Sequence, residues 1–406
     1  MTASSEKSGK TEGPLSGTRV IDLTRILAGP FCAMNLGDMG AEVIKIEKPG
    51  TGDDTRRWGP PFVGDQAAYF LGVNRNKRSV TLNLKEARGQ EILKTLLSEA
   101  DVLIENFKTG TLEGWGITSE WREKNAPQLV HCQITGYGDK GPKGGWPGYD
   151  FLLQAESGLM SITGEKDGGP AKLGVAIVDV CTGMYSAMAI LAALNARTHT
   201  GKGQKVTTTL FDTSLTMLVN VASNYLMGGK RPGRFGNGHP NIVPYRDFPC
   251  GEGEIALAVG NDEQFARFAA CVGHPEWAED AKYKTNPERV HNRDDIEARI
   301  REALSSDNAK SWIDQFAAKG IPCSMVYPVD EALESEQAKA NDMVVEVEHP
   351  TVGPIRMLGI PYHFSDTPEG IQSPPPVLGA DTDDILKDLV NLDDDEIASL
   401  RSSDVI

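Results

Sequence analysis

Short apolar runs alternate with amphipathic helical patterns through the first half of the chain. The runs Arg19–Leu23 and Glu42–Glu47 predict strands. Between them, Pro30–Met39 predicts a helix, with proline near its first turn and Gly40 directly after its end. A strand–helix–strand unit predicts parallel strands, and the alternation continues. We therefore predict one doubly wound, Rossmann-like α/β domain over residues 15–225.

The pattern changes after this domain. Residues 228–244 are rich in glycine and proline, and a single strand pattern followed by several helical patterns comes next. This succession predicts a second, smaller α+β domain over residues 226–330. Residues 331–406 are expected to form a linker and a return to the large domain, and the polar residues 1–14 a flexible tail.

Composition excludes several classes of function. The chain has 406 residues and a net charge of −16, so nucleic acid and anionic membranes are unfavourable partners. Its six cysteines form no CxxC pair, which favours a reducing, cytoplasmic location. The seven histidines show no spacing typical of metal ligands, so we predict no metal site. Because no apolar run approaches about 18 residues, we also predict no transmembrane helix.

Asp179 is the first candidate for chemistry. It follows the apolar run Val175–Val178 and precedes a long helical pattern, Met184–Leu194. A carboxylate at the start of a helix is favoured in its ionised form by the helix dipole, and apolar neighbours would strip it of water. Such a group is a candidate nucleophile for covalent catalysis. The alternative is that Asp179 only caps the helix.

Basic residues stand out in this acidic chain. Four of them lie close together in the sequence, namely Arg75, Lys77, Arg78 and Lys85. A fifth, Lys48, ends the second predicted strand. Ligands of doubly wound sheets bind at the carboxyl ends of the strands, so these cations are candidates for phosphate contacts. A solvated basic turn is the alternative.

Two glycine-rich stretches are candidates for ligand binding. The first, residues 136–150, ends in Tyr149 and Asp150, which open a helical pattern; a surface loop capped by Asp150 is the alternative. The second, residues 233–240, has the composition of a lid whose backbone amides could hold an oxyanion. His239 in this stretch is a candidate base. GxGxxG and GxxxxGK[ST] are both missing from the sequence, which counts against dinucleotide and P-loop sites.

Motifs spread over nearly the whole chain carry a family resemblance. They are Asp22–Pro30, Gly40–Gly50, Gly52–Arg56, Asn74–Ser79, Glu105–Phe107, Ile134–Gly138, Gly148–Asp150, Asp179–Gly183, Gly201–Gln204 and Val243–Tyr245. In this order they closely resemble the class III CoA-transferases, the group of formyl-CoA transferase and carnitine CoA-transferase, from about Leu15 to Leu386. Within that family, segments such as Trp58–Gly64, Lys282–Asn286 and Glu348–Gly353 are most similar to succinyl-CoA:glutarate CoA-transferases.

The resemblance implies an interlocked homodimer, coenzyme A as co-substrate and no tightly bound cofactor. It implies that Asp179 is the catalytic residue. The residues implied to bind CoA are Leu27, Ala28, Lys48, Leu82, Lys85, Asn106, Phe107, Tyr149 and Asp150. The residues predicted to contact the acyl or acid substrate are Arg25, Arg234, Gly236, Gly238 and His239, the two arginines because a planar guanidinium binds a carboxylate bidentately.

Three positions depart from relatives with this fold. Leu27 stands where formyl-CoA transferases have glutamine, and Gly114 stands where they have a CoA-binding arginine. α-Methylacyl-CoA racemases have histidine where this chain has Tyr149, and tyrosine is a poor proton acceptor near neutral pH. The sequence therefore favours a transferase over a racemase. A non-catalytic protein that binds CoA esters, with Asp179 as a helix cap, is the alternative from another class.

Overall fold

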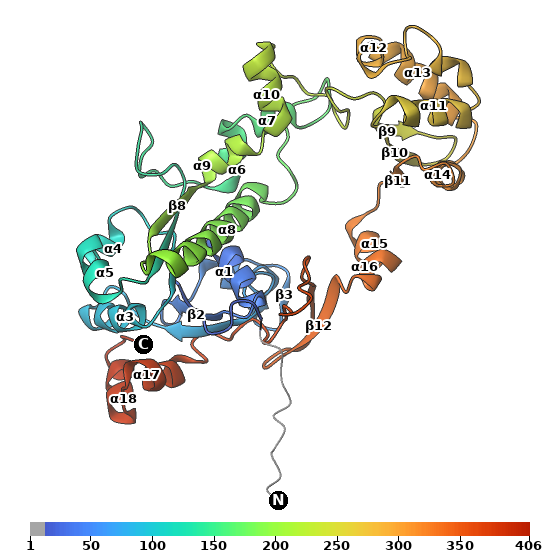
Figure 1. The fold of residues 1–406 in the computed structure, drawn as a ribbon. Coiled ribbons are helices and arrows are strands. Elements are labelled where there is room, and N and C mark those ends of the chain that lie inside the picture. Colours follow the sequence, from blue (N-terminus) through green and yellow to red (C-terminus); the bar gives the residue numbers. More distant parts are fainter. Residues whose placement is uncertain (1–12) are drawn as a thin grey trace, which may run out of the picture. The chain divides into compact units, whose positions relative to one another are not determined.

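The computed structural model describes residues 13–406 (Figure 1). The predicted tail, residues 1–14, lies outside the described residues except for Gly13 and Pro14. The chain divides into two compact units. The large unit contains residues 13–157, 175–217 and 336–406, and the small unit contains residues 158–174 and 218–335.

These units differ from the predicted domains in three places. Residues 158–174 leave the large unit and pack with the small one, and the boundary near residue 225 lies instead at residue 217. The small unit ends at Ser335, and the rest of the chain packs with the large unit. The hydrophobic pattern does not show that residues 158–174 belong to the small unit, because this depends on contacts with residues 218–335, which are distant in the sequence.

A six-stranded sheet forms the centre of the large unit. Its strands, in spatial order, are β5 (Lys77–Thr81), β2 (Glu42–Glu47), β1 (Arg19–Asp22), β6 (Val102–Glu105), β7 (Val130–Thr135) and β8 (Lys205–Thr209). All neighbouring pairs are parallel, which confirms the predicted parallel sheet. The order runs outward from β1 in both directions, so the switch point lies between β1 and β6.

Helices and small hairpins surround this sheet. The helices are α1 (Ala28–Asp38), η1 (Asp54–Arg57), α2 (Ala68–Leu71), α3 (Ala87–Ser98), α4 (Thr111–Gly114), α5 (Ser119–Asn125), α6 (Asp150–Glu156), α8 (Ile177–Thr200), α9 (Leu210–Thr216), α16 (Glu336–Ala340), α17 (Thr382–Val390) and α18 (Asp394–Ser402). The hairpins pair β3 (Phe62–Val63) with β4 (Gln66–Ala67), and β12 (Val344–His349) with β13 (Gly353–Leu358).

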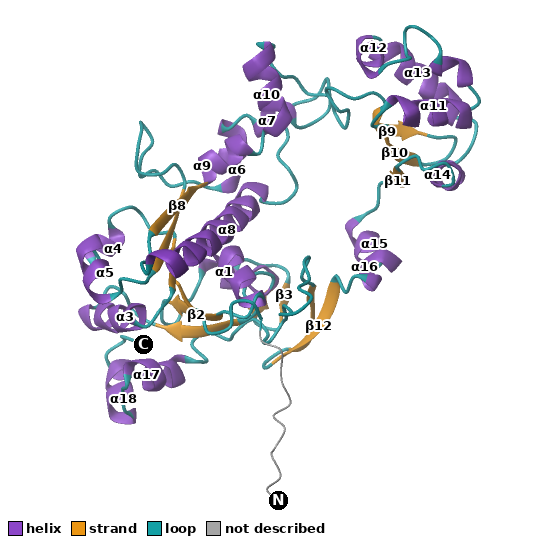
Figure 2. Ribbon diagram, in the orientation of Figure 1, coloured by secondary structure: helices purple, strands orange, loops and turns teal. Residues whose placement is uncertain are grey.

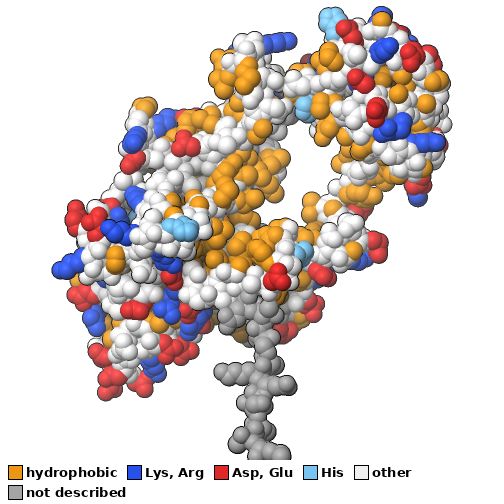
Figure 3. Space-filling view, viewed as in Figure 1, with side chains coloured by type: hydrophobic (Ala, Val, Ile, Leu, Met, Phe, Trp, Pro, Cys, Tyr) orange, Lys and Arg blue, Asp and Glu red, His pale blue; other side chains and the backbone are white. Residues whose placement is uncertain are grey.

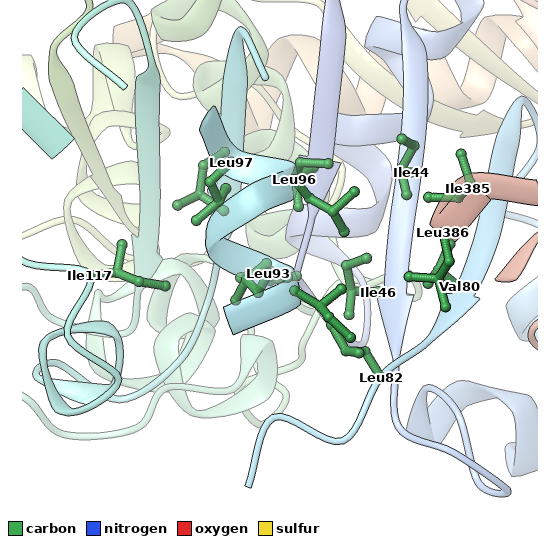
Figure 4. Packing of buried hydrophobic residues seen from close by; sticks show 14 of the residues in the cluster. Ile44, Ile46, Val80, Leu82, Leu93, Leu96, Leu97, Ile117, Ile385 and Leu386 are labelled. Carbon is green, nitrogen blue, oxygen red and sulfur yellow. The ribbon is translucent and has the colours of Figure 1, made fainter. Parts of the chain in front are cut away.

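The core lies on the two faces of the sheet. Successive side chains of a strand point to opposite faces, so alternate residues of β1 and β2 enter different layers. On one face Ile44 and Ile46 pack with Leu93 and Leu96 of α3 and with Leu386 of α17 (Figure 4). The C-terminal segment thus completes the core of the large unit.

Helix α8 packs on α1 and on strands β7 and β8. Gly183 allows the close approach, because a Cβ atom there would lie 2.6 Å from the carbonyl oxygen of Ala28. With 24 residues and a mean hydropathy of 1.8 in its most apolar window, α8 is long and apolar enough to cross a membrane. This criterion concerns length and composition only, and 39% of that window is buried within the structure.

The small unit has its own antiparallel sheet and core (Figure 2). Its strands are β9 (Tyr245–Pro249), β10 (Glu254–Ala258) and β11 (Cys323–Met325), in the order β11-β10-β9. Its helices are α7 (Leu159–Ile162), α10 (Val219–Gly228), α11 (Asp262–Cys271), η2 (Pro275–Ala278), α12 (Asn286–His291), α13 (Arg293–Leu304), α14 (Ala309–Ala317) and α15 (Val329–Leu333). Phe265, Phe268 and Phe316 lie at the centre of the core, which suits an α+β unit.

Candidate active site

A cavity of about 410 Å³ lies at the carboxyl end of the central sheet. The loops that follow β1, β6 and β7 provide most of its lining, which includes Ile134 and Gly136 at the end of β7. The strand order reverses between β1 and β6, and ligands of doubly wound folds bind at such a point. Topology alone therefore marks this cavity as the candidate site of the large unit.

Asp179 lines this cavity from the first turn of α8. The alternative role as N-cap is wrong, because the helix begins at Ile177 and its N-cap is Ala176. The cap comes instead from Asp150 at the start of α6. Its Oδ1 accepts hydrogen bonds from the amides of Val178 (2.7 Å) and Asp179 (3.3 Å).

Burial raises the pKa of Asp179 to about 7, and the neighbouring charge of Asp150 adds to the rise. A carboxyl group with this pKa exchanges its proton near physiological pH. Once ionised it is a stronger nucleophile than a fully solvated carboxylate, because few water molecules have to be displaced before it attacks. The site therefore combines a reactive acid with a second carboxylate that holds the helix in place.

The loop after β1 forms another wall of the cavity with Arg25, Leu27 and Ala28. Asn106, which follows β6, holds this loop through two hydrogen bonds to Arg25. Its Oδ1 accepts from the Arg25 amide (3.1 Å), and its Nδ2 donates to the Arg25 carbonyl (2.9 Å). Phe107 lies beside it and packs edge to face on Trp115.

The structure brings seven of the predicted residues to one cavity. They are Arg25, Leu27, Ala28, Asn106, Phe107, Tyr149 and Asp179. Lys48 and Lys85 are exposed and lie outside its lining. Leu82 is buried in the hydrophobic core, and its predicted contact with CoA stays a prediction. Asp150 is also buried and caps α8, and its predicted contact with CoA stays a prediction.

Two members of the basic cluster, Arg75 and Lys77, are neither exposed to a phosphate group nor part of a solvated turn. Arg75 is buried against Asp38, with 2.7 Å between Arg75 Nη2 and Asp38 Oδ2. Lys77 is buried against Asp22, with 3.0 Å between Lys77 Nζ and Asp22 Oδ2. Both cations hold the sheet to neighbouring segments, because a buried charge needs a partner.

Lys108 is a cation of the cavity lining that sequence reasoning missed. It follows Phe107 in the loop after β6 and is exposed. Its place at the carboxyl end of a central parallel strand was the available signal. Lys108 thus places a positive charge on the wall of the cavity.

The four remaining candidates belong to the small unit. Arg234 directs its guanidinium to backbone carbonyl oxygens of residues 161–168, among them that of Gly168. Gly236 has φ +59°, a conformation that favours glycine. His239 accepts a hydrogen bond from the Asn241 amide at Nδ1 (3.0 Å), and burial and the charge of Arg293 lower its pKa.

Among residues 13–406, His, Cys, Asp and Glu side chains form no group of three suited to a metal ion.

Comparison with known proteins agrees with this geometry. The model of the family described as CoA-transferase family III matches residues 15–382. Succinyl-CoA:glutarate CoA-transferase of Homo sapiens is 42% identical over 393 residues, covering 97% of this chain and 90% of that protein. Succinate–glutarate CoA-transferase of Agrobacterium fabrum is 40% identical, covering 94% of this chain and 96% of that protein.

A solved structure shares the fold as well. The crystal structure of a CAIB/BAIF family protein from Brucella suis superposes with a TM-score of 0.81 at 41% identity. The match covers 93% of this chain and all of the Brucella chain. Together with the cavity and its acid, these likenesses identify the chain as a member of CoA-transferase family III and as an enzyme with CoA-transferase activity.

Proposed function

We propose that this enzyme moves CoA from succinyl-CoA to glutarate, and that Asp179 carries the acyl group and CoA in turn. The observation that carries the proposal is the partly buried Asp179, with its pKa raised to about 7, in a cavity at the switch point of the sheet. The activities named for the human and Agrobacterium relatives support this donor and acceptor.

The first half-reaction transfers CoA to the enzyme. The Asp179 carboxylate attacks the thioester carbonyl of succinyl-CoA, a C–O bond forms, and the C–S bond breaks with CoA thiolate as leaving group. The thiolate then attacks the aspartyl carbonyl of this mixed anhydride. Succinate leaves as a carboxylate, and an aspartyl-CoA thioester remains on Asp179.

The second half-reaction runs through the same steps in reverse order. A carboxylate of glutarate attacks the aspartyl thioester and again releases CoA thiolate. The thiolate attacks the glutaryl carbonyl of the new anhydride, which yields glutaryl-CoA and the free Asp179 carboxylate. Each step passes through a tetrahedral oxyanion, which hydrogen-bond donors placed in advance would stabilise.

Arg25 is our preferred partner for the distal carboxylate of the diacid. It lines the cavity, and its side chain is 55% exposed. Its ion pair with Asp54, Arg25 Nη1 to Asp54 Oδ2 at 3.1 Å, is exposed and therefore weak enough to be exchanged for a substrate carboxylate. By contrast, the hydrogen bonds of Arg234 to three carbonyl oxygens tie it to its own unit.

Replacing Arg25 by alanine is expected to raise the KM for glutarate by about 10- to 100-fold, the loss typical of a hydrogen-bonded charged pair. The KM for a monocarboxylate such as butyrate is expected to change by less than about threefold, because that acid has no distal charge. Glutaryl-CoA and butyryl-CoA formation, followed by chromatography, measure both. Arg57→Ala is the matched control, since Arg57 also pairs with Asp54 and is 62% exposed but does not line the cavity. An unchanged KM for glutarate in Arg25→Ala would assign the distal carboxylate to another residue.

We further propose that two chains form an interlocked homodimer. Helix α8 presents Met184 and Met188 to solvent, each 57% exposed, and hydrophobic side chains gather over this helix (Figure 3). Tyr149, Phe151 and Leu152 at the start of α6 are exposed as well. Large exposed apolar patches are typical of surfaces that bind a partner, and a second copy of the chain would cover them.

The double substitution Met184→Glu and Met188→Glu is expected to prevent assembly of the dimer, so that the variant is obtained as monomers. Light scattering after gel filtration would then report half the wild-type mass, because two charges would be buried without partners at the interface. Thr198→Glu is the control, since it adds a charge to the exposed end of the same helix. A wild-type mass of one chain at micromolar concentration would refute the dimer.

A further inference from the structure

The loop between β1 and α1 has a strained backbone. Ile26 has φ +75°, in the left-handed region that favours glycine and is unfavourable for a β-branched residue. Such a conformation persists only where the surroundings hold it in place, and it is concentrated at functional sites. Ile26 lies between Arg25 and Leu27, and all three residues line the cavity of Asp179.

A buried ion pair between Lys45 and Asp53 holds this loop in place. The Ile26 amide donates to Asp53 Oδ1 at 3.3 Å. Asp53 Oδ2 lies 3.0 Å from Lys45 Nζ, and the two side chains are 0% and 1% exposed. Lys45 Nζ also donates to the carbonyl oxygen of Thr24 at 2.7 Å. The pair therefore holds two backbone groups of the loop, the amide of Ile26 and the carbonyl oxygen of Thr24.

Further hydrogen bonds hold the pair itself. The Asp53 amide donates to Glu47 Oε2 (2.9 Å), and Arg56 binds both oxygens of Glu47 (2.7 and 2.6 Å). Gly52 has φ +63°, and a Cβ atom there would lie 2.7 Å from the side chain of Arg56 and 2.8 Å from that of Glu47. The motif Gly52–Arg56, one of those shared with the family, thus encodes one connected support.

We propose that Asp53, together with Lys45, is a positioning residue for CoA transfer. It holds the Ile26 amide and so sets the wall Arg25–Ala28 of the cavity in which Asp179 reacts. Asn106 holds the other side of the same loop through the backbone of Arg25. The inference rests on the proposed role of Asp179, because a wall that is displaced by about 1 Å lowers the rate only if the acid is the reacting group.

Replacing Asp53 by alanine is expected to lower kcat by about 10- to 100-fold, while the Kd for succinyl-CoA changes less than about threefold. In a chain that also carries Ile26→Gly, the loss on Asp53→Ala is expected to shrink to about threefold or less. Glycine adopts φ +75° without steric cost, so the loop then depends less on Asp53. Steady-state transfer kinetics and equilibrium binding of succinyl-CoA measure these values in the four chains of the cycle.

Asp38→Ala is the matched control. It breaks an equally buried ion pair in the same unit, with Arg75, and is expected to lower Tm to a similar extent while kcat stays within about twofold. An equal loss of kcat on Asp53→Ala in both Ile26 backgrounds, or an unchanged kcat, would overturn the inference. If the wild-type chain itself transfers no CoA, the proposed function fails instead.

Hydrogen exchange of the wild-type protein tests the support without any substitution. The Ile26 amide is expected to exchange at least about 100-fold more slowly than an unprotected amide, because it is hydrogen-bonded to a buried carboxylate. This measurement decides the case in which Asp53→Ala does not fold. Exchange of the Ile26 amide at the rate of an unprotected amide would contradict the inference.

Discussion

Replacing Asp179 by asparagine is expected to lower kcat for CoA transfer by at least about 10⁴-fold. The amide has nearly the shape of the carboxylate but does not attack a thioester, so neither the anhydride nor the aspartyl-CoA thioester forms. Formation of glutaryl-CoA from succinyl-CoA and glutarate measures the loss. Binding of succinyl-CoA is expected to change little, because the other residues of the cavity remain.

The same variant is expected to be more stable than the wild type above pH 7. The folded-state pKa of Asp179 is raised from 3.8 to about 7, so the folded protein binds more protons than the unfolded chain between these values and loses stability as pH rises through them. Asparagine removes this loss of stability. We set the gain at about 2 kcal/mol at pH 8, which is about half the free energy that corresponds to the full pKa shift, because the Asp179 side chain is partly exposed. At pH 4 the two proteins are expected to unfold at similar temperatures.

A kcat of Asp179→Asn within tenfold of the wild-type value would exclude Asp179 as the nucleophile.

Activity is expected to fall steeply as pH decreases below about 7. The reacting form of Asp179 is the carboxylate, and its pKa is raised to about 7 by burial and by the charge of Asp150. Below that value kcat/KM is expected to fall about tenfold per pH unit, and above it to reach a plateau. Initial rates between pH 5 and 9 measure the midpoint.

Asp150→Asn tests the second cause of the raised pKa of Asp179, which is the charge of Asp150. Without the neighbouring charge, the midpoint is expected to move to lower pH. The rate on the plateau is also expected to fall, because a neutral amide caps the first turn of α8 less strongly than a carboxylate. A midpoint identical to that of the wild type would show that burial alone sets the pKa of Asp179.

The parallel sheet could be predicted because its signal is local. Strand β2 begins and ends where its apolar pattern does, at Glu42 and Glu47, and α1 differs from its predicted range by two residues at its start and one at its end. The start of α8 could not be predicted in this way. Its cap is Asp150, 28 residues before Val178, and no feature next to Asp179 reveals that contact.

Long-range ion pairs explain why Arg75 and Lys77 were misjudged. The partners of Arg75 and Lys77 are Asp38 and Asp22, which lie 37 and 55 residues away. A sequence shows which cations are present but not which of them are buried, and burial decides whether a cation meets a ligand or a carboxylate. Lys108 was missed for the opposite reason, since it has no basic neighbours in the sequence and its place at the switch point follows only from the strand order.

Hydroxylamine trapping tests the central claim most directly. The wild-type protein and Asp179→Ala are incubated with succinyl-CoA and hydroxylamine, and their peptides are compared by mass spectrometry. A hydroxamate on Asp179 of the wild type, with none in the variant, is the result expected for acyl transfer through this residue. Wild-type protein that binds succinyl-CoA and yields no hydroxamate at Asp179 would contradict the covalent mechanism.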